Sequence, residues 1–140
     1  MSFDPAHPLA GARVATRLPC QDLDRARRFY SEALGLDPDE EREGGLLYRM
    51  ANGEFALFAS AGAASGESTQ MGFEVDDIEA VVAALRARGL EFEEVEMPGM
   101  DIRDGITDVP GNYPSKGGRG ERAVWFRDSE GNLMGMGQRV

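Results

Sequence analysis

Cysteine and histidine are almost absent from the sequence, which has one residue of each among its 140 positions. A single cysteine, Cys20, cannot form a disulfide within the chain, which fits a reducing compartment, so we expect a cytoplasmic protein. The only histidine, His7, lies in a proline-flanked segment ahead of the first expected strand. One chain therefore cannot supply a metal site with two histidines and a carboxylate. We find no Ser-His-Asp arrangement either, because His7 would have to serve as its histidine.

Long apolar runs and basic residues are also scarce. No stretch approaches the roughly 18 apolar residues that span a bilayer. The first residues, MSFDPAHPLAGARV, have neither the basic nor the apolar region of a secretory signal. Lysine and arginine number 15 against 25 acidic residues, which gives a net charge of −10. This charge disfavours nucleic acids and anionic membranes as partners. It would attract a cationic small molecule, although solubility alone also explains it.

The sequence does contain an internal repeat. LPCQDLDRARRFYSEALGL and FEVDDIEAVVAALRARGL each read as a strand, an aspartate and an amphipathic helix that ends at Gly-Leu. Asp22 and either Asp76 or Asp77 are suited to cap the helices, and Gly35 and Gly89 are suited to end them. The segment NGEFALFA resembles EGNLMGMG, with Leu57 aligned to Gly135. Each half is therefore predicted to contain one strand, one helix and three further strands.

We predict an α+β fold of two tandem βαβββ modules within a single domain, residues 1–140. Module one covers about 12–60, with strands near 13–20, 37–42, 45–50 and 54–59. Module two covers about 69–138, with strands near 69–76, 91–96, 121–127 and 132–138. Residues 97–120 are rich in Pro, Gly and Asp, and we expect them to form a loop without helix or strand. Loops of this length are usually lids, binding loops or disordered segments.

Two motifs resemble the vicinal oxygen chelate superfamily, which includes glyoxalase I, extradiol dioxygenases, and fosfomycin- and bleomycin-resistance proteins. The motifs are D-L-x-x-A-x-x-F-Y at Asp22–Tyr30 and D-x-x-G-N at Asp128–Asn132. The resemblance extends from about Ala12 to Gln138, except for the long loop. It implies that the modules curl a mixed sheet into a cup that binds a ligand, and that the protein is a homodimer. One such scaffold hosts many chemistries, so the activity stays open.

In metalloenzymes of this type, four strand positions hold the metal. The resemblance places them here at Ala15, Leu57, Gln70 and Gly135. Only Gln70 has an atom that binds a metal, whereas divalent cations take several oxygen or imidazole ligands. A shift of one residue would bring in Glu54 or Glu74 and still leave a weak set. We therefore expect no metal and no other cofactor.

Strand alternation predicts which side chains face the cup. If Met71, Phe73 and Val75 pack beneath the helix, their neighbours face the cup, and the repeat extends this assignment to module one. We also expect the loop 97–120 to be mobile and to bring two side chains to a ligand. The candidate ligand-binding residues are Arg17, Phe55, Leu57, Gln70, Glu74, Tyr113, Lys116, Trp125 and Gly135.

Several of these residues also have a structural explanation. Arg17 and Glu74 form either ligand contacts or an ion pair with each other. Gln70 either orients a ligand or satisfies a backbone group. Trp125 belongs to the core, to a dimer interface or to a ligand platform. Gly135 is either pocket volume or a site of close packing.

Three functions are compatible with these residues. The favoured one is a metal-free protein of the bleomycin-resistance kind that binds a small organic ligand in the cup. The first alternative is a glyoxalase-like or dioxygenase-like enzyme, either a lyase or an oxidoreductase. The second is a metal-free enzyme in which Glu74 acts as general base beside Arg17. This role requires a pKa raised by the partly apolar cup.

Overall fold

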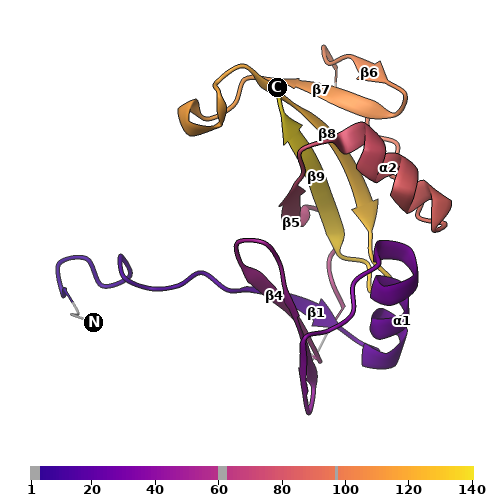
Figure 1. Cartoon of the computed structure of the whole chain (residues 1–140). Helices are drawn as coiled ribbons and strands as arrows, with labels where there is room; N and C mark the ends of the chain where they lie inside the picture. Colours follow the sequence, from indigo (N-terminus) through magenta and orange to yellow (C-terminus); the bar gives the residue numbers. More distant parts are fainter. Residues whose placement is uncertain (1–3, 60–62, 97) are drawn as a thin grey trace.

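The computed structural model describes residues 4–59, 63–96 and 98–140 (Figure 1). Module one consists of β1 (Thr16–Cys20), α1 (Leu23–Leu34), β2 (Glu40–Arg42), β3 (Gly45–Arg49) and β4 (Glu54–Ala59). Module two consists of β5 (Thr69–Glu74), α2 (Ile78–Ala87), β6 (Ile102–Arg103), β7 (Ile106–Pro110), the 3-10 helix η1 (Pro114–Lys116), β8 (Gly120–Arg127) and β9 (Leu133–Arg139). The predicted α+β fold of two tandem modules is confirmed, and module two has one additional short strand, β6.

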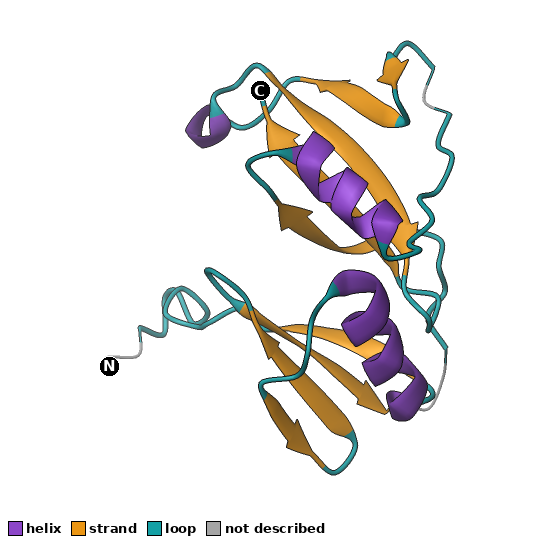
Figure 2. Ribbon diagram, turned by 45° about the vertical axis from the view of Figure 1, so that its right-hand side comes forward, coloured by secondary structure: helices purple, strands orange, loops and turns teal. Residues whose placement is uncertain are grey.

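The two modules have the same sheet topology. Module one has the strand order β1-β4-β3-β2, and module two has the order β5-β9-β8-β7-β6. In each sheet the first strand pairs in parallel with the last, and the remaining pairs are antiparallel. Figure 2 shows α1 and α2 on the same side of the two sheets. We call the opposite sides the open faces, because neither helix covers them.

Both helices begin at the predicted aspartates. The Asp22 carboxylate accepts a hydrogen bond from the Arg25 N–H at 3.0 Å, and Asp77, rather than Asp76, accepts one from the Ala80 N–H at 3.1 Å. Helix α1 ends at Gly35, whose φ of 70° is left-handed and suits glycine. Neither α-helix of the described residues is long and apolar enough to cross a membrane.

One apolar core joins the modules. Leu18, Tyr30 and Leu57 of module one pack in the same cluster as Phe126 and Met134 of module two. The rings of Phe55 and Phe73 also meet across the junction, with centroids 6.2 Å apart. Fully burying such a side chain stabilises the fold by roughly 1.5–3 kcal/mol. The modules therefore share this core, and module two has a second apolar cluster of its own, formed by Ile78, Val82, Ile106, Val124 and Met136.

The prediction for residues 91–120 was wrong in two respects. Residues 91–96 are not a strand, although the Glu93 N–H donates to the Trp125 carbonyl of β8 at 2.8 Å. The strand beside β8 is β7, which lies inside the expected loop and pairs with β8 from Thr107 to Pro110. A two-residue turn, Asp104–Gly105, joins β6 to β7, and both turn residues have positive φ, 54° and 80°. Asp-Gly favours this hairpin turn. Met97 lies outside the described residues.

The alignment of the closing strands was also wrong, by one residue. Arg17 pairs with Ala56, and the equivalent position in module two pairs Gly72 with Gly135. Gly135 therefore corresponds to Ala56 and not to Leu57. Because side chains alternate between the two faces of a strand, a one-residue shift reverses every assignment. This shift moves the expected positions of Phe55 and Leu57 from the open face to the helix side.

Candidate functional site

Glycines form the floor of the open face of module two. Gly72 and Gly135 pair across β5 and β9, and Gly137 follows two residues later on the same face. The Trp125 side chain lies against Gly135, where an added Cβ would be 3.5 Å from the indole Nε1. The Glu121 carboxylate lies over Gly137, where an added Cβ would overlap it. The missing side chains therefore make room first for other side chains of the same sheet.

A cavity of about 460 Å³ opens on this face. Three predicted ligand-binding residues, Glu74, Tyr113 and Lys116, line it together. The Lys116 ammonium forms an ion pair with the Glu74 carboxylate, although the two residues lie far apart in the sequence. Tyr113, on the segment between β7 and η1, is 73% exposed. The segment that was expected to bring Tyr113 and Lys116 to a ligand therefore places both residues in one cavity with Glu74.

The electrostatic environment of Glu74 differs from the expectation. The hydrogen bond from Lys116 lowers the pKa of the Glu74 carboxyl, and this outweighs the opposing effect of burial. The Glu74 side chain is 65% exposed, so the surroundings are not apolar. The prediction of a raised pKa, which a general base would need, was wrong because the prediction did not place Lys116 beside this carboxylate.

The other predicted residues lie elsewhere. Arg17 lines a separate cavity of about 300 Å³ on the open face of module one, and it has no ion pair among the described residues. The Arg17–Glu74 ion pair, one of the two alternatives for these residues, does not form, and Glu74 pairs with Lys116 instead. Gln70 is exposed at a bulge in β5. Phe55 and Leu57 were assigned wrongly, because their side chains pack in the core, with exposures of 2% and 0%.

With the alignment corrected, the four family metal positions are Ala15, Ala56, Gln70 and Gly135. This set contains one amide and no carboxylate or imidazole. Divalent cations bind through several such oxygen or nitrogen ligands, so these residues do not fit a metal ion. Among residues 4–59, 63–96 and 98–140, no cluster of three or more His, Cys, Asp or Glu side chains has the arrangement of a metal site.

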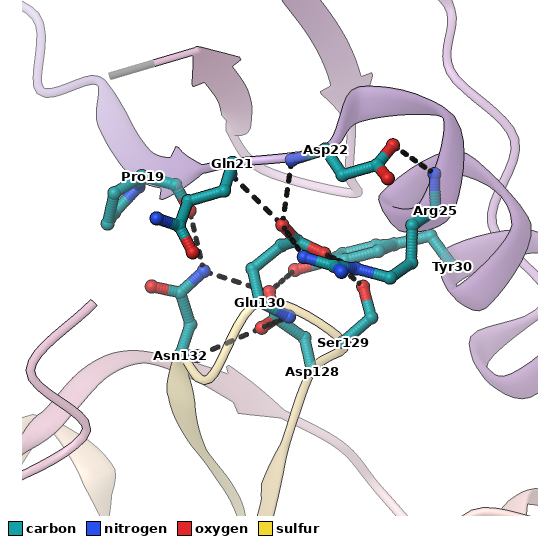
Figure 3. Close-up of polar contacts among 9 residues, drawn as sticks. All are labelled: Pro19, Gln21, Asp22, Arg25, Tyr30, Asp128, Ser129, Glu130 and Asn132. Atoms are coloured by element: carbon teal, nitrogen blue, oxygen red, sulfur yellow. Dashed lines mark hydrogen bonds and ion pairs between the residues drawn. The ribbon is translucent and has the colours of Figure 1, made fainter. Parts of the chain in front are cut away.

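A partly buried polar cluster connects the β8–β9 turn with the start of α1 (Figure 3). We call it the module clasp. It consists of Asp128, Ser129, Glu130 and Asn132 from the turn, and of Pro19, Gln21, Asp22, Arg25 and Tyr30 from module one.

Glu130 is the centre of the module clasp. Its Oε1 accepts hydrogen bonds from the backbone N–H groups of Gln21 and Asp22, both at 3.0 Å, and Arg25 donates to both carboxylate oxygens. Burial raises the pKa of the Glu130 carboxyl. The hydrogen bonds from Arg25, Asp22 and their neighbours outweigh this effect and hold the pKa at about 2. Glu130 therefore stays ionised inside the protein.

Asp128 and Asn132 complete the module clasp. The Tyr30 hydroxyl donates to Asp128 Oδ2 at 2.7 Å, and the Asn132 amide donates to the Pro19 carbonyl at 3.0 Å. Burial and the nearby Asp128 raise the pKa of Tyr30. Burial and the nearby Glu130 raise the pKa of Cys20 to about 12, so this thiol is inert at neutral pH. These groups tie the modules together rather than presenting reactive atoms.

Comparison with known proteins identifies the family. Residues 12–135 match the model of the Glyoxalase/Bleomycin resistance protein/Dioxygenase superfamily. The chain belongs to this superfamily. No curated protein matches the sequence at a significant level.

Solved structures of glyoxalase-superfamily proteins share the fold. A glyoxalase/bleomycin resistance protein/dioxygenase from Alicyclobacillus acidocaldarius has a TM-score of 0.66 and 15% identity, with 93% of this chain and 92% of that chain covered. A protein with the same description from Nocardioides has a TM-score of 0.60 and 20% identity, with coverages of 91% and 82%. A lactoylglutathione lyase from Agrobacterium tumefaciens has a TM-score of 0.59 and 20% identity, with coverages of 91% and 93%. At these identities the likeness concerns the fold.

Sequence reasoning missed part of the site in this glyoxalase-superfamily protein. Asn112, Glu121 and Arg139 also line the cavity beside Glu74. Strand alternation could have predicted two of them. Glu121 lies on the same face of β8 as Ala123 and Trp125, and Arg139 lies on the same face of β9 as Gly135 and Gly137. The two ends of the module clasp coincide with the motifs at Asp22–Tyr30 and Asp128–Asn132, but their pairing had no signal in the sequence. The bonds that join them span 98 positions for Tyr30 and Asp128 and 109 for Gln21 and Glu130.

Proposed function

We propose that this protein binds a small organic molecule, without a metal ion, in the cavity on the open face of module two. The observation that carries the proposal is the convergence of Glu74, Tyr113 and Lys116 around about 460 Å³ of space. A concave site with a few charged and aromatic groups is typical of small-molecule recognition. The single buried cysteine, Cys20, supports a reducing, cytoplasmic setting.

The proposed ligand carries polar groups that match both signs of charge. Lys116 and Arg139 supply positive charge to the cavity, and Glu74 and Glu121 supply negative charge. The Lys116–Glu74 pair is partly exposed, so a charged ligand can exchange with either partner at small cost. The Tyr113 ring, mostly exposed in the free protein, loses water contact when a ligand enters.

The proposal includes a homodimer in which the two modules act as one domain. The open face of module one carries Arg17 and Arg42, and that of module two carries Glu121; none of the three has an ion pair among the described residues. Half-buried apolar side chains, Leu47, Ala56 and Phe58, line the module one cavity beside Arg17. Opposite charges with an apolar centre favour pairing of the two faces between two copies of the chain.

Enzymatic alternatives have weaker support. The Glu74 carboxyl, with a lowered pKa, is a poor general base near neutral pH. The corrected metal positions hold one amide, which argues against a metal-dependent lyase or dioxygenase. Elemental analysis tests this part of the proposal: one equivalent of bound Zn, Fe, Mn or Ni, removed by a chelator with a lower melting temperature, would contradict it.

A thermal-shift screen of charged organic molecules tests the binding function. A true ligand is expected to raise the melting temperature of the wild-type protein, and Glu74→Gln or Lys116→Met should reduce that rise. Glu67→Gln, an exposed carboxylate ahead of β5, is the matched control and should leave the rise unchanged. A ligand whose effect survives both site variants binds elsewhere, and the cavity assignment would then be wrong.

A further inference from the structure

A second cavity lies between residues 89–96 and the β6–β7 hairpin. It has a volume of about 1070 Å³, and we call it the seam cavity. It shares no lining residue with the cavity beside Glu74. Its lining side chains include Arg86, Phe92, Val95, Ile102, Thr107 and Trp125, together with the four glutamates at positions 91, 93, 94 and 96.

One part of the wall of the seam cavity is apolar and aromatic, and the rest is polar. Phe92 and Trp125 are half-buried, Leu90 is buried, and Ile102 is 48% exposed, an unusual position for a large aliphatic side chain. Thr107 lines the same cavity with only 2% of its surface exposed. The apolar part of the wall is therefore formed by Leu90, Phe92, Ile102 and Trp125.

The charge of the seam cavity is strongly negative. Four glutamates and one arginine line it. Glu93 is neutralised by Arg127 at 2.6 Å, whereas Glu91, Glu94 and Glu96 have no ion-pair partner among the described residues. The Arg86 guanidinium stands 5.5 Å from the centre of the Phe92 ring and covers one face of this ring, so Trp125 is the lining aromatic residue without this contact.

We propose that the seam cavity binds an organic cation with an apolar body. The aromatic and aliphatic walls receive the body, and the unpaired carboxylates neutralise the charge. An anion of the same shape is excluded by three unpaired carboxylates, and a small hydrated cation gains nothing from the apolar walls. The site goes beyond the proposed function, because Glu74, Tyr113 and Lys116 take no part in it.

The experiment uses tetraphenylphosphonium as the probe and tetraphenylborate, an anion of nearly the same shape, as the control. Trp125 is the only tryptophan of the chain and lines the seam cavity, so its fluorescence reports occupancy directly. Tetraphenylphosphonium is expected to quench it in a saturable manner at low salt, with weaker binding at high salt. Equilibrium dialysis measures the same affinity without depending on Trp125.

Two double variants distinguish the effect of the carboxylates that line the seam cavity from the effect of the net charge of the protein. Glu94→Gln combined with Glu96→Gln should raise the dissociation constant roughly threefold to tenfold, as expected for partly exposed charges. The control combines Glu32→Gln with Glu67→Gln, which changes the net charge equally at exposed positions outside the seam cavity. It should change the dissociation constant by less than about twofold.

The assignment would be overturned by equal binding of the borate, by equal weakening in both double variants, or by the absence of saturable phosphonium binding. Weakening by Glu74→Gln would place the probe in the other cavity and would also contradict the proposal. Melting curves of all variants verify that each one is folded, so a loss of affinity reports on the site.

Discussion

Module one and module two have the same strand order but differ in what lies on their open faces and in how their last turns are used. On β4 of module one, Ala56 and Phe58 point to the open face, whereas the equivalent positions on β9 are Gly135 and Gly137. The β3–β4 turn, Met50–Gly53, is exposed and closed by one backbone hydrogen bond. The β8–β9 turn is buried in the module clasp. The two modules therefore share one topology, but module one serves as a scaffold, whereas module two contains the proposed site and the turn that joins the modules.

The largest predicted effect is the loss of the module clasp. Asp128→Ala leaves the buried Tyr30 hydroxyl and the backbone N–H of Asn132 without their acceptor, whereas the Asn132 side-chain amide keeps the Pro19 carbonyl. We expect the free energy of unfolding to fall by about 3–5 kcal/mol. The matched change in the exposed turn of module one, Asn52→Ala, should cost less than about 0.5 kcal/mol. Urea denaturation measures both, and equal losses would mean that the two turns contribute alike.

The second prediction concerns the dependence of stability on pH. The folded pKa of Glu130, about 2, lies below its ordinary value of 4.5. The unfolded chain therefore binds the proton more readily, and the stabilisation is complete above about pH 4.5 and is lost as the pH falls towards 2. The full effect amounts to no more than about 3 kcal/mol. Glu130→Gln should flatten this part of the profile, and Glu54→Gln, an exposed residue of module one, should not.

The third prediction compares the equivalent positions Gly135 and Ala56. In Gly135→Leu the new side chain meets Thr69 and Trp125, which already lie 3.5 Å from an added Cβ. We expect a loss of about 1–3 kcal/mol and a shift of the Trp125 fluorescence. Ala56→Leu enters the open cavity of module one and should cost less than about 1 kcal/mol. Unchanged fluorescence in Gly135→Leu would show that the leucine occupies free volume instead.

The smallest predicted effect belongs to the Lys116–Glu74 pair. Because Glu74 is 65% exposed, a double-mutant cycle with Lys116→Met and Glu74→Gln should give a coupling below about 0.5 kcal/mol that disappears at high salt. The exposed Arg49–Glu40 pair of module one should behave in the same way. A coupling above about 1 kcal/mol would indicate that the pair is shielded from water by the η1 segment.

The elements with a strong local signal could be predicted from the sequence. The two helices, with Asp22 and Asp77 as caps, follow from apolar periodicity and from side chains that satisfy the first backbone N–H groups. The Asp104–Gly105 turn had an equally local signal. It was missed because the composition of residues 97–120 was read as a whole instead of residue by residue.

The sequence could not show in the same way which side chains of the closing strands face the helices and which face the open side. The two closing segments are similar enough to align, but a shift of one residue costs little similarity and exchanges the two faces. This shift is the reason that Phe55 and Leu57 were assigned to the open face and not to the core. The Lys116–Glu74 pair and the module clasp depend on contacts between distant segments, for which one sequence contains no pattern.

The bonds of Glu130 to Gln21 and Asp22 have a consequence for the order of synthesis. The ribosome synthesises α1 early. The Glu130 carboxylate, which accepts hydrogen bonds from the N–H groups of Gln21 and Asp22, lies more than 100 residues downstream. Until the ribosome has released the β8–β9 turn, water must occupy these donors, and the start of α1 frays. Contacts of such long sequence separation also slow folding. A nascent chain that stops before Asp128 should therefore keep the first turn of α1 open to proteases, and only the full-length chain closes it.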